Sequence, residues 1–94
     1  MIGVTAKLPI QPGKEAEFEA AFSELTNLVR ANEAGCLQYE LFREPGTANY
    51  IVFERYTDKA ALDAHGQTDY FLAAHPVLGA LLAGAPVIEV FESV

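Results

Sequence analysis

The sequence predicts an α+β sandwich, in which helices cover one face of a four-stranded antiparallel sheet. Four short segments either alternate apolar with polar residues or are rich in β-branched and aromatic ones, which is typical of strands. Helical stretches separate these segments, except for a short turn-rich link that predicts a hairpin between the second and third strands. The chain has 94 residues, 51% of them hydrophobic, so residues 1–94 are expected to form one domain with its own core.

The first strand is predicted over residues 2–10, where apolar side chains alternate until Pro12-Gly13 interrupts the pattern. A helix is predicted over residues 15–31, because its apolar residues are spaced for one face: Phe18, Phe22, Leu25 and Val29. Acidic residues in its first turn suit the positive end of the helix dipole. Gly35 is expected to end the helix.

Two further strands are predicted over residues 36–43 and 50–56. The later segment is dense in β-branched and aromatic side chains, which favours a strand. Residues 45–49 between them contain proline, glycine and asparagine, so the link is a turn. Because it is short, the two strands are expected to pair as an antiparallel hairpin.

A short helix over residues 59–65 is predicted after a capping residue, Thr57 or Asp58. A second helical stretch begins after the cap at residues 68–69 and extends to the glycine and proline that precede the last strand. Its apolar set comprises Phe71, Leu72, Leu78, Leu81 and Leu82. Pro76 lies inside this stretch and is expected to kink it or to start a new turn.

The last strand is predicted over residues 87–91, which completes a βαββαβ order typical of a ferredoxin-like sandwich. Apolar or aromatic side chains occur at both parities of the third and last strands: Tyr50, Ile51, Val52, Phe53, Tyr56, Val87, Ile88, Val90 and Phe91. Helices can cover only one face of the sheet, so a second copy of the chain is expected to cover the other. The alternative is a monomer that exposes a few aromatic residues.

Composition narrows the class of function. Thirteen acidic residues against six basic ones give a net charge of −7, which argues against binding nucleic acid or anionic membrane surfaces. A single cysteine, Cys36, forms no disulfide within the chain, and His65 and His75 lack the clustered partners of a metal site. Neither a glycine-rich nucleotide motif, a membrane span nor a signal peptide is evident, so a cytoplasmic protein is expected.

Three stretches together resemble the antibiotic biosynthesis monooxygenase family of the dimeric α/β-barrel superfamily. They are Pro12-Gly13-Lys14-Glu15 before the first helix, Gly35-Cys36-Leu37-Gln38-Tyr39-Glu40-Leu41, and Phe53-Glu54-Arg55-Tyr56-Thr57-Asp58 followed by Ala60-Ala61-Leu62-Asp63-Ala64-His65. The likeness extends over essentially the whole chain. The resemblance implies a dimeric α/β barrel. Within the family the chain is similar to small quinol monooxygenases, and other members include anthrone oxygenases, an isomerase and haem-degrading enzymes.

The resemblance implies that His65 lies in a cavity between the helices and the sheet. Imidazole suits such a site, because it can accept a phenolic or enolic proton near neutral pH. Glu54 is expected to orient His65 through a hydrogen bond, since a carboxylate on this strand is costly without a partner. The alternatives are a His65 that only caps its helix and a Glu54 that pairs with Arg55 or another cation.

Five aromatic residues are expected to bind substrate: Tyr39, Phe53, Tyr56, Tyr70 and Phe71. Each has core packing as its alternative. Tyr56 stands where the family usually has tryptophan, and Tyr70 stands where it commonly has a second histidine. His75 lies in a stretch similar to the segment that carries the axial histidine of haem-degrading members, although the matching strand and helix residues differ.

The predicted function is a cofactor-independent monooxygenase that combines dioxygen with a small electron-rich aromatic substrate, such as a quinol, a phenol or a polyketide-like ring. His65 and Glu54 are the expected catalytic residues, and no metal or cofactor is expected. Two alternatives are a non-catalytic small-molecule-binding or stress-response protein on the same scaffold, and a haem-degrading monooxygenase. Oxygen uptake with quinols separates the first of these from the enzyme, and a haem titration tests the second.

Overall fold

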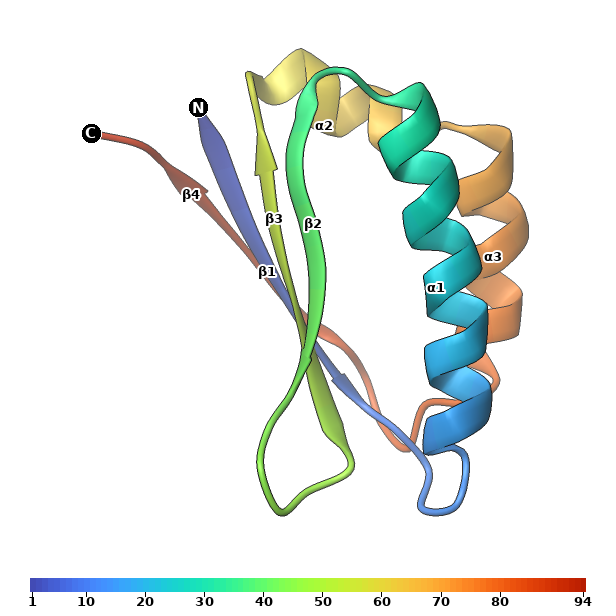
Figure 1. The fold of residues 1–94 in the computed structure, drawn as a ribbon. Helices are drawn as coiled ribbons and strands as arrows, with labels where there is room; N and C mark the ends of the chain where they lie inside the picture. The colour runs from blue at the N-terminus through green and yellow to red at the C-terminus, as the bar shows by residue number, and fades with distance from the viewer.

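The computed structural model describes residues 1–94 and confirms the predicted ferredoxin-like βαββαβ arrangement (Figure 1). The strands are β1 (Ile2–Pro9), β2 (Cys36–Arg43), β3 (Asn49–Tyr56) and β4 (Val87–Glu92), and the helices are α1 (Glu15–Asn32), α2 (Lys59–His65) and α3 (Asp69–Gly79). The strands form one antiparallel sheet in the order β2-β3-β1-β4. All three helices lie on the same side of this sheet.

Alternation along β3 divides its side chains between the two faces of the sheet. Tyr50, Val52 and Tyr56 are buried under the helices, and Glu54 shares their parity. Glu54 pairs with Val4 of β1 and with Tyr39 of β2, so these three residues lie side by side on the inner face. Phe53 has the opposite parity and is 40% exposed on the outer face. Parity therefore places Glu54 and Phe53 in different environments.

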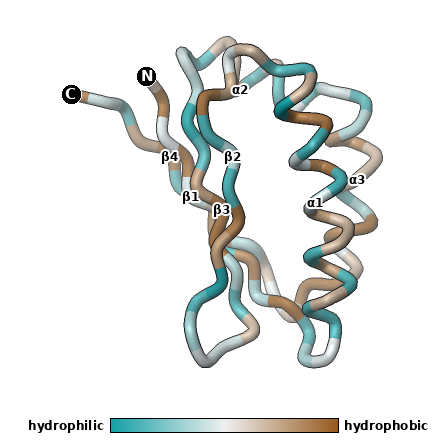
Figure 2. Tube along the Cα trace, viewed as in Figure 1, coloured by the Kyte–Doolittle hydropathy of each residue, from teal (hydrophilic) through white to brown (hydrophobic).

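The predicted apolar face of α1 forms the centre of the core. Phe18, Phe22, Leu25 and Val29 are all buried, and hydropathy alternates along the helix (Figure 2). The ring of Phe22 stacks on that of Tyr39 at a centroid distance of 5.5 Å. Burying one such side chain contributes about 1.5–3 kcal/mol, which fixes α1 against the sheet. None of the three helices combines the length and apolar character that a membrane crossing requires.

The two later helices begin at the predicted caps but end differently from the prediction. Asp58 accepts a hydrogen bond from the backbone of Ala61, and Thr68 caps α3 in the same way. The last helix continues through Pro76 and ends at Gly79, so the helical interpretation of Leu81 and Leu82 is wrong. These two residues form a tight turn whose amides bond to carbonyls three residues earlier. Their apolar side chains pack against the core without belonging to the helix.

Strand β4 extends beyond the cover that the helices provide. It pairs only with β1 at the edge of the sheet, and every one of its residues is exposed. Figure 1 shows it diverging from α1 and α3 toward the end of the sheet where both termini lie. Ile88 and Val90 face the helix side of the sheet, yet they are 62% and 57% exposed. Ile88 and Val90 therefore form an apolar margin on β4, beside the helix layer.

Gly35 allows α2 to approach the start of β2. A Cβ atom at this position would lie 2.8 Å from Cβ of Ala61 and 3.3 Å from Oγ1 of Thr57. We expect Gly35→Ala to lower the free energy of unfolding by about 1–3 kcal/mol, because the added methyl group forces the helix away. Chemical denaturation measures this loss. Gly66→Ala is the control, because a Cβ atom there would make only ordinary contacts. Adding Ala61→Gly to Gly35→Ala should recover part of the loss. Equal stability of Gly35→Ala and Gly66→Ala would contradict the steric explanation.

Candidate active site

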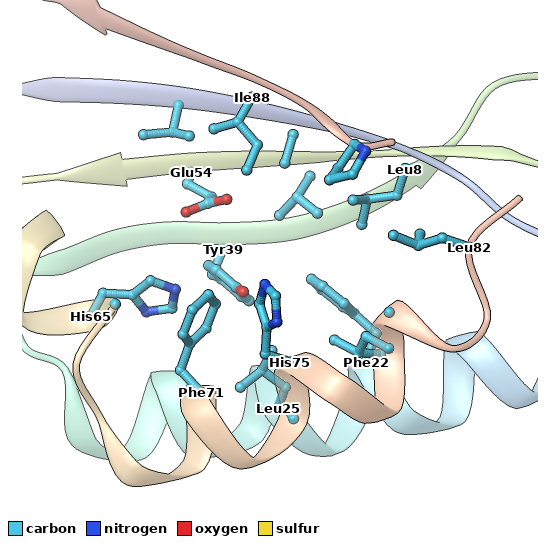
Figure 3. Close-up of a pocket in the computed structure, with 18 of the residues that line it drawn as sticks. Leu8, Phe22, Leu25, Tyr39, Glu54, His65, Phe71, His75, Leu82 and Ile88 are labelled. Carbon is cyan, nitrogen blue, oxygen red and sulfur yellow. The ribbon is translucent and has the colours of Figure 1, made fainter. Parts of the chain in front are cut away.

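A cavity of about 330 Å³ lies between the sheet and the helices. Hydrophobic side chains make up 14 of its 20 lining residues, and Figure 3 shows apolar side chains from β1, α1 and α3 along its walls. Four of the predicted site residues line it: Tyr39, Glu54, His65 and Phe71. A largely apolar cavity with a few convergent polar groups is the usual form of a small-molecule site.

His65 is held at one end of this cavity by α2, of which it is the last residue. The residue is only 4% exposed. Its imidazole packs among the rings of Tyr39, Tyr56 and Phe71, at centroid distances of 5.3, 5.6 and 4.7 Å. These contacts restrict the ring to one orientation, so His65 does more than cap its helix.

The carboxylate that orients His65 is Glu33, and the expectation that Glu54 does so is wrong for this structure. Nδ1 of His65 lies 3.0 and 3.1 Å from the two oxygens of Glu33. The hydroxyl of Tyr70 also donates to Glu33. A carboxylate accepts hydrogen bonds, so it favours the tautomer with the proton on Nδ1 and leaves the lone pair on Nε2.

Nε2 of His65 is available to a molecule in the cavity. Every fully buried side-chain nitrogen and oxygen in the protein has a hydrogen-bond partner. Nε2 makes no hydrogen bond, so it is not fully buried, and it belongs to a residue that lines the cavity. The imidazole therefore presents a basic nitrogen to the cavity while Glu33 holds the other nitrogen.

Glu54 is a second buried carboxyl group, on the sheet side of the cavity (Figure 3). The hydroxyl of Tyr56 donates to its Oε1 at 2.5 Å, whereas Arg55 donates to Gln38 instead of pairing with Glu54. Burial raises the pKa of Glu54, and the charge of Glu33 acts in the same direction; the Tyr56 hydroxyl and His65 oppose this shift. Glu54 therefore keeps its proton to a higher pH than an ordinary glutamate does.

The raised pKa of Glu54 predicts a pH-dependent effect of Glu54→Gln. As pH rises above the ordinary value of 4.5, the unfolded carboxyl loses its proton before the folded one, so wild-type stability falls. Glutamine keeps an oxygen for Tyr56 and cannot ionise. We expect the variant to melt a few degrees above wild type near pH 8 and to match it near pH 4, whereas the exposed Glu24→Gln should show no such difference. A melting temperature below wild type at both pH values would contradict this.

The remaining predicted aromatic residues occupy three different positions. Tyr39 lines the cavity, makes no hydroxyl hydrogen bond and has its pKa raised by burial, so its hydroxyl is a protonated donor. Tyr56 and Tyr70 lie outside the lining, and their hydroxyls donate to Glu54 and Glu33. Phe53 lies on the outer face, edge-to-face with Phe42, so its expected place in the cavity is wrong.

Cys36 is a partly buried thiol that donates a hydrogen bond to the carbonyl of Gln38. Burial, assisted by the charges of Glu33 and Glu54, raises its pKa from 9.0 to about 11. At about pH 8 the thiolate fraction is then roughly 100-fold lower than in an ordinary cysteine, and only the thiolate reacts. We expect iodoacetamide to label the native protein at least that much more slowly than the chain in concentrated guanidinium chloride, as measured by mass spectrometry; equal rates would show a reactive thiol.

His75 also lines the cavity, from α3, and lies against Phe71 at a ring distance of 6.1 Å. Unlike His65, it is exposed and has no carboxylate partner. No group of three or more histidine, cysteine, aspartate or glutamate side chains is placed to hold a metal ion. The two histidines therefore differ in environment, and only His65 is fixed by its surroundings.

This protein is a small α+β domain whose apolar cavity holds one buried imidazole bound to a carboxylate. Such a cavity is typical of domains that bind small molecules, and enzymes are among them. Residues 1–77 match the family model of the antibiotic biosynthesis monooxygenases, and the chain belongs to this family. Its fold and its family agree with the resemblance seen in the sequence.

Individual relatives support the same assignment. YcnE of Bacillus subtilis, provisionally named a monooxygenase, is 35% identical over 72 residues, which cover 76% of this chain and 75% of YcnE. A solved structure from Caulobacter crescentus CB15, described provisionally as an antibiotic biosynthesis monooxygenase, is 50% identical and superposes with a TM-score of 0.96, covering 99% of this chain and 89% of the other. The structure of Rv0793 from Mycobacterium tuberculosis is 25% identical, with a TM-score of 0.90, and the match covers 99% of this chain and 94% of that one.

Proposed function

We propose that this protein is a cofactor-independent monooxygenase for a small electron-rich aromatic substrate, and that it works as a homodimer. The observation that carries this proposal is the imidazole of His65, which has Nδ1 on Glu33 and Nε2 open to an apolar cavity. Membership of the monooxygenase family and the provisional names of its relatives support the same reaction class.

In the proposed reaction His65 takes a phenolic or enolic proton from the bound substrate onto Nε2. The resulting anion reduces dioxygen directly, so the substrate itself supplies the electrons. One oxygen atom enters the ring or becomes a carbonyl, and the other leaves as water with two hydrogens from the substrate. The apolar walls exclude bulk water from the reactive intermediate.

Two further polar groups would act on the substrate oxygen. The Tyr39 hydroxyl and the protonated form of Glu54 are hydrogen-bond donors, and both residues line the cavity near His65. Donors aimed at an oxygen that gains negative charge stabilise the anion. Phe71 offers an aromatic surface on which a flat ring can stack.

The homodimer part of the proposal rests on the outer face of the sheet. Exposed apolar side chains there come from three strands: Phe42, Phe53, Val87 and Phe91. No helix covers this face, and a second copy of the same sheet is a matching cover.

Oxygen uptake tests the proposed activity. The probes are hydroquinone, 1,4-naphthohydroquinone and anthrone, each corrected for autoxidation without protein. We expect accelerated uptake with at least one probe and incorporation of one atom of labelled dioxygen into its product. The acceleration should be lost in His65→Ala but not in Glu24→Ala, a substitution of an exposed residue outside the cavity. Binding of a probe without accelerated uptake would instead support a non-catalytic binding protein.

A further inference from the structure

A second pocket borders α2 on a different face from the cavity that His65 lines. Its volume is about 310 Å³, and it shares no lining residue with the first cavity. Its eight lining residues come from the end of α1, the start of β2, α2 and the start of α3: Asn32, Glu33, Gly35, Cys36, Ala61, Ala64, Thr68 and Tyr70. We call it the polar pocket.

Glu33 connects this pocket to the cavity. Glu33 is one of the residues that line the polar pocket, and its carboxylate bonds to Nδ1 of His65, a residue that lines the cavity. The side chains of His65 and Glu33 are 6% and 12% exposed, so the contact between them is largely screened from water. His65 and Glu33 therefore form a continuous polar path between two spaces that are otherwise separate.

The position of Glu33 is not explained by the stability of α1. It directly follows the last residue of this helix, and its amide still bonds to the carbonyl of Val29. Carbonyl groups make this end of a helix negative, so a carboxylate there is unfavourable. The hydrogen bonds from His65 and Tyr70 compensate for that cost, and burial raises the pKa of Tyr70 to about 12, which keeps its hydroxyl a donor.

We propose, resting on the function proposed above, that Glu33 is the positioning residue of His65 and exchanges protons between it and water in the polar pocket. When the substrate gives its proton to Nε2, the proton on Nδ1 moves to Glu33 and then to water. The reverse sequence returns a proton when the reduced oxygen needs one. Only protons move along this path, so it needs no oxidant or reductant.

The tautomer of His65 tests the positioning role without any substrate. Nitrogen-15 NMR near pH 8.5 distinguishes a proton on Nδ1 from one on Nε2, and His75→Gln identifies the signals of the second histidine. We expect Nδ1 to carry the proton in wild type and in the exposed control Glu24→Ala. In Glu33→Ala the proton should move substantially to Nε2, and an unchanged tautomer would overturn the positioning role.

Rescue by formate tests access through the polar pocket. Formate can replace the missing carboxylate, so adding it to Glu33→Ala should restore the Nδ1 tautomer in a saturable way. Ala64 lines the polar pocket but not the cavity. Ala64→Leu in the same chain should therefore prevent the rescue, and rescue that is equal with and without this substitution would show that formate enters by another route.

Glu33→Gln separates positioning from proton transfer. The amide oxygen still accepts a hydrogen bond from Nδ1, but the amide does not carry a proton as a carboxylate does. We expect this variant to keep the wild-type tautomer while its Nδ1 proton exchanges with water at least tenfold more slowly, and unchanged exchange would overturn the transfer role. If wild type shows no oxygen uptake with the aromatic probes, the proposed function fails, whereas these NMR measurements still decide the role of Glu33.

Discussion

Replacement of His65 by alanine is expected to lower turnover of a responsive aromatic probe by roughly 10²-fold or more, the usual contribution of a positioned general base. The reason is that no other nitrogen base in the cavity is fixed in place. His75 is exposed and lacks a partner carboxylate, and the Tyr39 hydroxyl has a pKa raised by burial, so it is a poor proton acceptor. Oxygen consumption by wild type and variant, at matched folded concentration, measures the loss.

Stability has to be measured beside turnover, because His65 is buried more deeply than its place at a helix end predicts. Removing the imidazole deprives Glu33 of a hydrogen bond and leaves space among three aromatic rings. A lost hydrogen bond to a charged group costs about 1.5–3 kcal/mol, so a lower melting temperature is expected in His65→Ala. His65→Gln keeps an amide that can donate a hydrogen bond to Glu33, so it serves as the matched control for stability.

Added imidazole distinguishes a catalytic from a structural role of His65. Free imidazole can occupy the space left in His65→Ala, so it should restore part of the turnover. Full turnover of His65→Ala without imidazole would exclude His65 as the base, because the substrate proton must then leave by another route. If His65→Ala and His65→Gln lose turnover only in proportion to the fraction of protein that is unfolded, the role of His65 is structural.

Local patterns predict most of this fold because each one records the environment of a single element. The spacing of Phe18, Phe22, Leu25 and Val29 defines the buried face of α1, and the turn before Asn49 defines the β2–β3 hairpin. The end of α3 could not be predicted in this way. Apolar residues continue past Gly79 with helical spacing, but they serve the core from a turn.

The candidate site was only partly predictable, since its key contact joins residues distant in the sequence. Glu33 and His65 are 32 residues apart, and no periodic pattern links them. One available signal was an acidic residue at the negative end of a helix, where a structural role is unfavourable. The misplacement of Phe53 was avoidable, because period two along β3 already places it on the opposite face from Glu54.

Phe53 instead lies among the outer-face residues on which the proposed homodimer depends. Arginine at this position would replace the aromatic ring by a charged side chain between two packed sheets. Glu40 lies directly opposite on β2, but pairing with it repays little of the cost of removing both charges from water. Wild type is expected to sediment at twice the 10.2 kDa mass of the chain. Because a buried aromatic anchor contributes at least about 2 kcal/mol to binding, Phe53→Arg should weaken dimerisation by roughly 30-fold or more.

Sedimentation equilibrium across a concentration series measures this shift. Leu28→Arg is the matched control, because Leu28 is an exposed apolar residue on α1, away from the outer face of the sheet. It should leave the dimer intact, and circular dichroism should show both variants folded, since Phe53 is not part of the buried core. A wild-type monomer at micromolar concentration would remove the homodimer from the proposed function. A dimer unaffected by Phe53→Arg would move the interface to the apolar margin of β4, where Ile88 and Val90 are exposed.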